Sequence, residues 1–184
     1  MKQLQIVTVH RELWLSNQFQ TPRTSLWLIY SLDFIGVLRK NKAIAAKIKE
    51  VMQEDDVAIG HSNGCAILVK ALYQGAVIDK LILINPALDK HYKFPKGVKE
   101  IHVFHNKHDK AVVAAKWLRK IVFWRNNFLW GEMGNTGYKG NDKRVTNYQL
   151  AKGHSALFNK KNLAKLTKII TAVLTAKQNL PKAS

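Results

Sequence analysis

With 184 residues, 47% of them hydrophobic, the chain is long enough for one domain with a substantial core and too short for two ordinary domains. We therefore expect a single domain over residues 1–184. The lone cysteine, Cys65, excludes an internal disulfide and a multi-cysteine metal site. No apolar stretch reaches the length of a membrane span, and the first apolar run is broken by Arg11 and Glu12, so we expect a soluble, cytoplasmic protein without a transmembrane segment.

The charge is strongly basic, with 30 Lys and Arg against 12 Asp and Glu and a formal net charge of +18. Such a surface attracts nucleic acid, anionic lipid or another polyanion. The lysines are spread along the chain, without a basic tail, a paired-cysteine finger or an aromatic RNA-binding motif. The pattern favours a general basic surface, and a polyanionic partner stays open.

Short apolar runs alternate with longer amphipathic segments along the chain. The runs that predict strands are 4–10, 25–32, 57–61, 80–88 (ended by Pro86), 100–105 and 144–150. The segments that predict helices are 42–52, 64–74, 111–121 and 160–177, and the Gly- and Asn-rich residues 125–142 indicate a long loop.

Several of these strands are continuous apolar runs rather than alternating ones, which is typical of strands buried on both faces. The sequence therefore predicts an α/β fold with a mostly parallel sheet of about six strands and helices on both faces. In such sheets, ligands and chemistry lie beyond the carboxyl ends of the strands.

A serine stands at one of these ends, in the stretch "GHSNG" between a predicted strand and a predicted helix. A sharp strand-to-helix turn strains the backbone of Ser62, and the small residues Gly60 and Gly64 relieve crowding between strand and helix. The turn exposes the hydroxyl, and the N–H groups of the first helical turn favour an oxyanion. The motif thus predicts a nucleophile elbow.

A serine nucleophile needs a base and a carboxylate that orients the base. Asp109 follows the strand that ends near His105, and His154 follows the last predicted strand, each just before a predicted helix. The order Ser62, Asp109, His154 is that of the α/β-hydrolase triad. Asp33, just past the second strand, is an alternative acid.

On "GHSNG", "HNKHDKAV" and "KGHSALF", the sequence resembles a small member of the α/β-hydrolase superfamily without a cap domain. The resemblance implies acyl transfer to water through an acyl-enzyme on Ser62, with an ester or related acyl compound as small-molecule substrate and no cofactor or metal. It also implies an oxyanion hole made by the backbone N–H groups of Asn63 and Glu12. The chain departs from the family at "VHREL", where Arg11 replaces a glycine, and in residues 15–24, where a loop stands in place of a helix.

Other residues have structural explanations. His61 and Cys65 are expected to pack in the core. A zinc site is not expected from His102, His105 and His108, because their spacing does not place three imidazoles on one face of a strand. The aromatic residues in the long loop and next to it are expected either to line an acyl pocket or to fold over the preceding helix: Trp124, Phe128, Trp130 and Tyr138. The lysines of the last helix form a solvated face, with a membrane-surface role as the alternative.

A second class of function stays open beside the hydrolase. In it, the same scaffold is a basic binding module for nucleic acid or another polyanion, and the triad is vestigial. The net charge favours this alternative, whereas the presence of all three triad residues favours the enzyme. The sequence does not indicate an oligomeric state.

Overall fold

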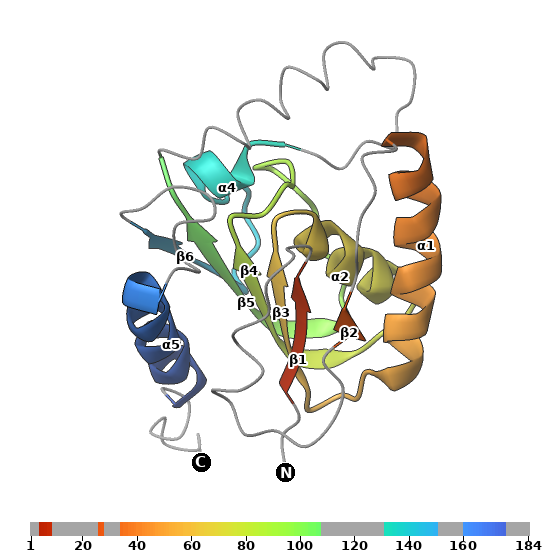
Figure 1. The fold of residues 1–184 in the computed structure, drawn as a ribbon, viewed down its shortest axis with the longest axis horizontal. Helices are drawn as coiled ribbons and strands as arrows, with labels where there is room; N and C mark the ends of the chain where they lie inside the picture. Colours follow the sequence, from red (N-terminus) through yellow and green to blue (C-terminus); the bar gives the residue numbers. More distant parts are fainter. Residues whose placement is uncertain (1–3, 9–25, 28–33, 108–130, 151–159, 176–184) are drawn as a thin grey trace.

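The computed structural model describes residues 4–8, 26–27, 34–107, 131–150 and 160–175 (Figure 1). At residues 4–8, 26–27, 34–40, 160–165 and 174 only the backbone is described. The predicted helix over 111–121 lies outside the described residues.

The described strands form one parallel sheet with the order β2-β1-β3-β4-β5-β6. Their bounds are β1 Leu4–Thr8, β2 Leu26–Trp27, β3 Val57–His61, β4 Ile78–Ile84, β5 Val98–His105 and β6 Val145–Gln149. The register aligns the carboxyl ends of the last four strands, because His61 pairs with Ile84, Ile84 with Phe104 and His105 with Gln149. The predicted α/β fold with a parallel sheet is confirmed.

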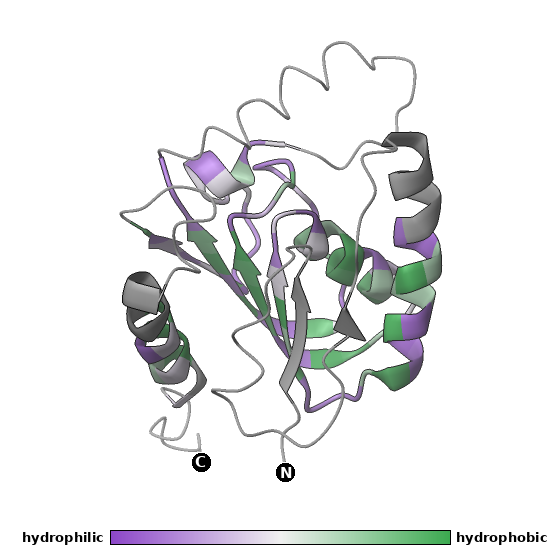
Figure 2. Ribbon diagram, in the orientation of Figure 1, coloured by the Kyte–Doolittle hydropathy of each residue, from purple (hydrophilic) through white to green (hydrophobic). Residues whose placement is uncertain are grey.

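Helices cover the two faces of the sheet, as Figure 1 shows. The helices are α1 Phe34–Val51, α2 Asn63–Tyr73, the short α4 Met133–Thr136 and α5 Lys160–Thr175. One apolar cluster joins α1 and α2 to one face of the sheet, and a second joins α5 to the other. β4 is apolar along most of its length (Figure 2), as expected for a strand buried between two layers. In β5, the apolar residues alternate with the polar residues Lys99, Glu100, His102 and His105.

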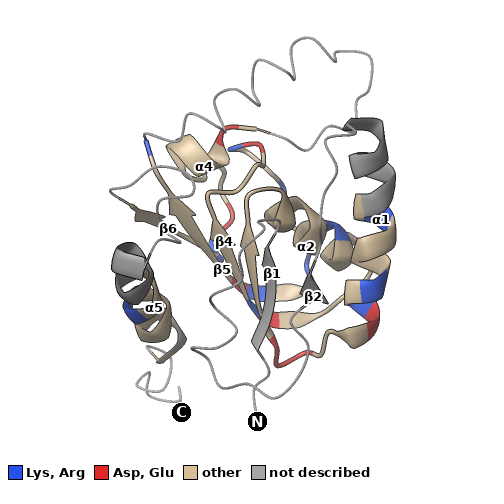
Figure 3. Ribbon diagram, viewed as in Figure 1, with Lys and Arg blue, Asp and Glu red and all other residues tan. Residues whose placement is uncertain are grey.

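Charge lies mostly outside these two clusters. In Figure 3, Lys and Arg lie on α1, on α5 and on connecting loops. Three charged residues of the described segments are nevertheless buried: Asp56, Asp79 and Lys80. Lys80 is 2% exposed, and its Nζ lies 3.3 Å from Glu100 Oε2 on the adjacent strand. None of the helices in the described part of the chain has the length and the hydropathy needed to cross a membrane.

Three segments differ from the sequence prediction. The strand predicted over 80–88 is β4, Ile78–Ile84, which ends before Asn85 because the positive φ of that residue, 44°, does not continue an extended strand. α1 begins at Phe34 rather than at Lys42, so it includes Gly36, which lowers helix propensity. Within the predicted loop 125–142, residues Met133–Thr136 form α4. The backbone there is tied to the segment after β4, because Met133 N donates to Leu88 O (2.9 Å) and Gly134 N to Pro86 O (2.9 Å).

Candidate active site

Ser62 occupies a strained turn between β3, which ends at His61, and α2, which begins at Asn63. Its backbone angles are φ 54° and ψ −122°, a conformation that residues with a side chain rarely adopt. Ser62 N donates to Ile84 O (3.0 Å), and Ser62 O accepts from Cys65 N (3.2 Å) and Ala87 N (3.3 Å). The turn is therefore fixed between the first turn of α2 and the end of β4, and the side chain is partly exposed.

Gly60 allows α2 to approach β3. A Cβ at residue 60 would lie 2.9 Å from Cys65 Cα, Cys65 N and Leu68 Cδ1. Backbone atoms cannot move aside as a flexible side chain can, so this position requires glycine. The prediction that Gly60 relieves crowding between strand and helix is confirmed, and Gly64 is buried in the first turn of α2.

The residue after the serine is held by a side chain from α1. Asn41 Nδ2 donates to Asn63 Oδ1 (3.2 Å), and Asn63 Nδ2 donates to Asn41 Oδ1 (3.3 Å). Both residues are buried, at 5% and 8% exposed, so the amide pair links α1 to the start of α2 in a region shielded from water. The backbone N–H of Asn63 lies at the positive end of the α2 dipole, as an oxyanion donor would. Asn41 was not predicted from the sequence. It could have been recognised as a polar amide on the same helix face as the apolar residues that pack in the core.

The side chains that flank Ser62 in sequence are buried. His61 is 2% exposed and Cys65 is fully buried. The Cys65 thiol donates to Ile84 O (3.7 Å), and burial raises its pKa far above its usual range, so the thiol stays protonated. The predicted core position of Cys65 is confirmed, and among these three side chains only that of Ser62 is partly exposed.

Polar residues also lie at the carboxyl ends of β4 and β5, on the same edge of the sheet as Ser62. Asn85 has a positive φ of 44° and its N–H donates to Phe104 O (2.8 Å), while Asn106 N donates to Gly134 O (2.8 Å). Burial lowers the pKa of His105, so the imidazole is neutral near pH 7. The ring forms a hydrogen bond with the backbone of Asn135. Gly137, with φ 74°, fits against that ring. The end of β5 is thus covered by the segment that contains α4.

The predicted partners of Ser62 lie outside the described residues: Asp109, His154, the oxyanion donor Glu12, and the alternative acid Asp33. β5 and β6 end at His105 and Gln149, the strand ends that precede Asp109 and His154 in the chain, at the same edge as Ser62. Trp124, Phe128 and Trp130 also lie outside. Tyr138 is buried against Phe94, with ring centroids 5.6 Å apart, and lines a pocket to which Ser62 does not contribute.

The histidines of β5 do not share a face. His102 Nδ1 lies 3.3 Å from the Tyr148 hydroxyl and its Nε2 lies 3.5 Å from Glu100 Oε2, beside the cluster that contains α5. His105 lies at the strand end, against Gly137. His108 is outside the described residues, and among those described no group of side chains has the arrangement of a metal site.

No protein-family model matches the chain, and no curated protein matches it. Among solved structures, the chain is similar to a candidate YdeN-like hydrolase from Pectobacterium atrosepticum, at 16% identity with a TM-score of 0.41. The alignment covers 91% of this chain and 92% of the other. At this TM-score the similarity supports no conclusion about the reaction.

Proposed function

We propose that the protein is a serine hydrolase that cleaves a carboxylic ester or related acyl bond, on a six-stranded α/β-hydrolase fold without a cap domain. One observation carries the proposal: the strained backbone of Ser62, at the carboxyl edge of a parallel sheet and at the start of a helix. Strain of this kind costs about 1–3 kcal/mol and persists where the surroundings enforce it, which is typical of functional sites.

The chemistry follows from the triad order. Ser62 Oγ attacks the carbonyl carbon while His154 accepts its proton; the proton then passes to the leaving group, and an acyl-enzyme forms. Water, deprotonated by His154, attacks the acyl carbon and releases the acid. Asp109 orients the imidazole. The backbone N–H of Asn63 stabilises the oxyanion, and that of Glu12 is the proposed second donor.

The amide pair supports this role for Asn63. The first N–H of α2 stabilises an oxyanion only if it is held in place before the substrate arrives. The two hydrogen bonds between Asn41 and Asn63 supply that restraint, because they join the residue to a different helix. Asn41 is therefore a positioning residue in the proposal.

The connections in the described part of the chain favour a small substrate. Many members of the superfamily insert a cap between the strands that correspond to β4 and β5, whereas here residues 85–97 alone join them and many are buried. A site without a cap at this position should hydrolyse short, water-soluble activated esters. It should show no increase in rate when a long-chain ester passes its solubility limit.

Turnover of p-nitrophenyl acetate tests the proposal. Ser62→Ala and His154→Ala should each reduce kcat by about 10⁴-fold or more, because the serine and the base act as a unit. Ser184→Ala removes a serine hydroxyl far along the chain and should leave kcat unchanged. Wild-type turnover that persists in Ser62→Ala would show that the hydrolysis does not use this serine.

A further inference from the structure

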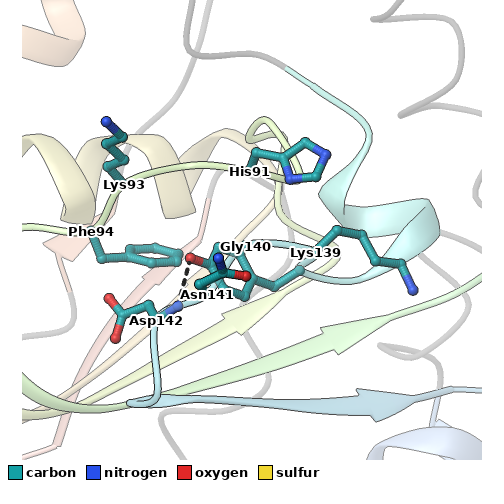
Figure 4. A pocket seen from close by; sticks show the side chains of 8 residues that line it. His91, Lys93, Phe94, Lys139, Gly140, Asn141 and Asp142 are labelled. Atoms are coloured by element: carbon teal, nitrogen blue, oxygen red, sulfur yellow. Dashed lines mark hydrogen bonds between the residues drawn. The ribbon is translucent and has the colours of Figure 1, made fainter.

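The structure has a pocket with a volume of about 660 Å³ to which Ser62 does not contribute (Figure 4). Its walls are two loops: one between β4 and β5, with His91, Lys93 and Phe94, and one before β6, with Tyr138, Lys139 and Asp142. Ser62 and Asn63 do not line it, so the proposed reaction does not explain it.

Arg144 fixes the two walls relative to each other. Its Nη1 donates to Pro95 O (2.8 Å) and Val98 O (2.9 Å), and its Nη2 donates to Phe94 O (3.2 Å). These bonds hold the first loop. The guanidinium also donates to both carboxylate oxygens of Asp142 in the second loop, at 2.9 and 2.6 Å. The pocket is therefore built into the fold before any ligand binds.

Two aromatic rings form the base of the pocket. Phe94 and Tyr138 are each 8% exposed, and the Tyr138 hydroxyl accepts from Asp142 N (3.3 Å), as the dashed line in Figure 4 marks. The side chain of Asn147 bonds to both backbone groups of Tyr138, at 2.8 and 2.9 Å. Because the rings are nearly covered, they offer little surface for stacking a base or another flat ligand.

The carboxylates near the pocket already have cationic or backbone partners. Asp142 pairs with Arg144, which lowers the pKa of its carboxyl group, and Glu132 Oε1 lies 2.8 Å from Lys90 Nζ. Asp89 Oδ1 accepts from the backbone N–H of His91 (2.9 Å). Asp142 is the acid among the residues that line the pocket, and the charge of Arg144 balances its own.

Lys93 and Lys139 are exposed and come from opposite walls. No carboxylate in the described part of the chain lies within ion-pair distance of either. In Figure 4 the side chains of Lys93 and Lys139 extend away from each other, with the imidazole of His91 between them. A preformed concavity with two lysines of this kind is electropositive, and the net charge of +18 raises the local concentration of anions further.

We propose that this pocket binds a small anion with two or more linked phosphate groups. Lysine ammonium groups bind phosphate as point charges and do not need the bidentate geometry of arginine. Because the side chains of Lys93 and Lys139 extend to opposite sides of the pocket, they suit a ligand whose charges are spread over several linked groups better than one with a single carboxylate. The covered rings argue against recognition of bases, so the phosphates supply the affinity.

Calorimetric titration of the full chain with inorganic tripolyphosphate tests this proposal. The double variant Lys93→Ala/Lys139→Ala should lower the affinity by about tenfold or more, since two charge contacts are lost. The control Lys47→Ala/Lys96→Ala removes the same charge from exposed lysines outside the pocket and should change the affinity by less than about twofold. Equal losses in the two double variants, or no binding by the wild type, would overturn the proposal.

A second arm identifies the source of the phosphate. A short single-stranded oligonucleotide should bind no more tightly than tripolyphosphate and should be displaced by it. An oligonucleotide that binds tightly and loses affinity in the pocket variant, while tripolyphosphate does not bind, would overturn the small-ligand proposal in favour of nucleic acid. Esterase activity is measured in parallel, and because neither lysine contacts Ser62, it should be equal in all variants whether or not the pocket binds phosphate.

Discussion

Replacing Ser62 by glycine should stabilise the protein relative to replacing it by alanine. Elsewhere in a folded chain the order is the reverse, because glycine loses more conformational freedom on folding. At residue 62, however, φ is 54° and ψ is −122°, a combination that glycine adopts freely and alanine does not. Both variants lack the hydroxyl, so the comparison isolates the backbone.

The magnitude follows from two opposing terms. Relief of the strain contributes about 1–3 kcal/mol, and the additional freedom of glycine in the unfolded chain costs about 0.5–1 kcal/mol. The Ser62→Gly variant should thus exceed Ser62→Ala by about 1 kcal/mol in the free energy of unfolding, or about 2–4 °C in Tm for a chain of this size. Urea denaturation followed by circular dichroism measures the difference.

The exposed helical residue Lys47 provides the matched control. There Lys47→Gly should be less stable than Lys47→Ala by about 1 kcal/mol. If glycine is also the less stable replacement at residue 62, the backbone of Ser62 is not strained, and the observation that carries the proposed function fails.

Three further predictions concern the site and its support. Gly60→Ala should destabilise the fold by about 1–3 kcal/mol in urea denaturation, because its Cβ would meet Cys65 at 2.9 Å; an unchanged midpoint would contradict the close approach. Arg144→Met should lower the free energy of unfolding by about 3 kcal/mol. The wild type should also lose stability as the pH falls below the ordinary pKa of 3.8, since Asp142 has a depressed pKa in the fold, and this loss should shrink in the variant. Asp109→Asn should reduce kcat on p-nitrophenyl acetate by about 10⁴-fold, and Asp33→Asn far less; the opposite order would move the acid to residue 33.

The parts of the fold that depend on local pattern could be predicted from the sequence. The buried run of β4 and the strand-to-helix turn at Ser62 each appear within a few consecutive residues. The need for Gly60 also follows from the turn alone, because strand and helix meet within five residues. Such features require no knowledge of distant contacts.

Features that depend on tertiary contacts were missed. Asn41 and Asn63 are 22 positions apart, and their pairing depends on where α1 packs. Residues 131–137 have the Gly and Asn content of a loop, yet Gly131 and Gly134 allow this segment to lie against the backbone of Asp89 and Asn85, and Met133 is fully buried. A glycine that permits close approach and a glycine that forms a turn look alike in the sequence.

Covalent labelling of the native chain by a fluorophosphonate, with the adduct located by peptide mass spectrometry, tests the central claim most directly. An activated serine at the elbow predicts one adduct per chain, on the peptide that contains Ser62, which is absent in Ser62→Ala and strongly reduced in His154→Ala. Circular dichroism of each variant verifies that the fold is intact. A natively folded wild type that remains unlabelled, or that is labelled on another residue, would contradict the assignment of Ser62 as the nucleophile.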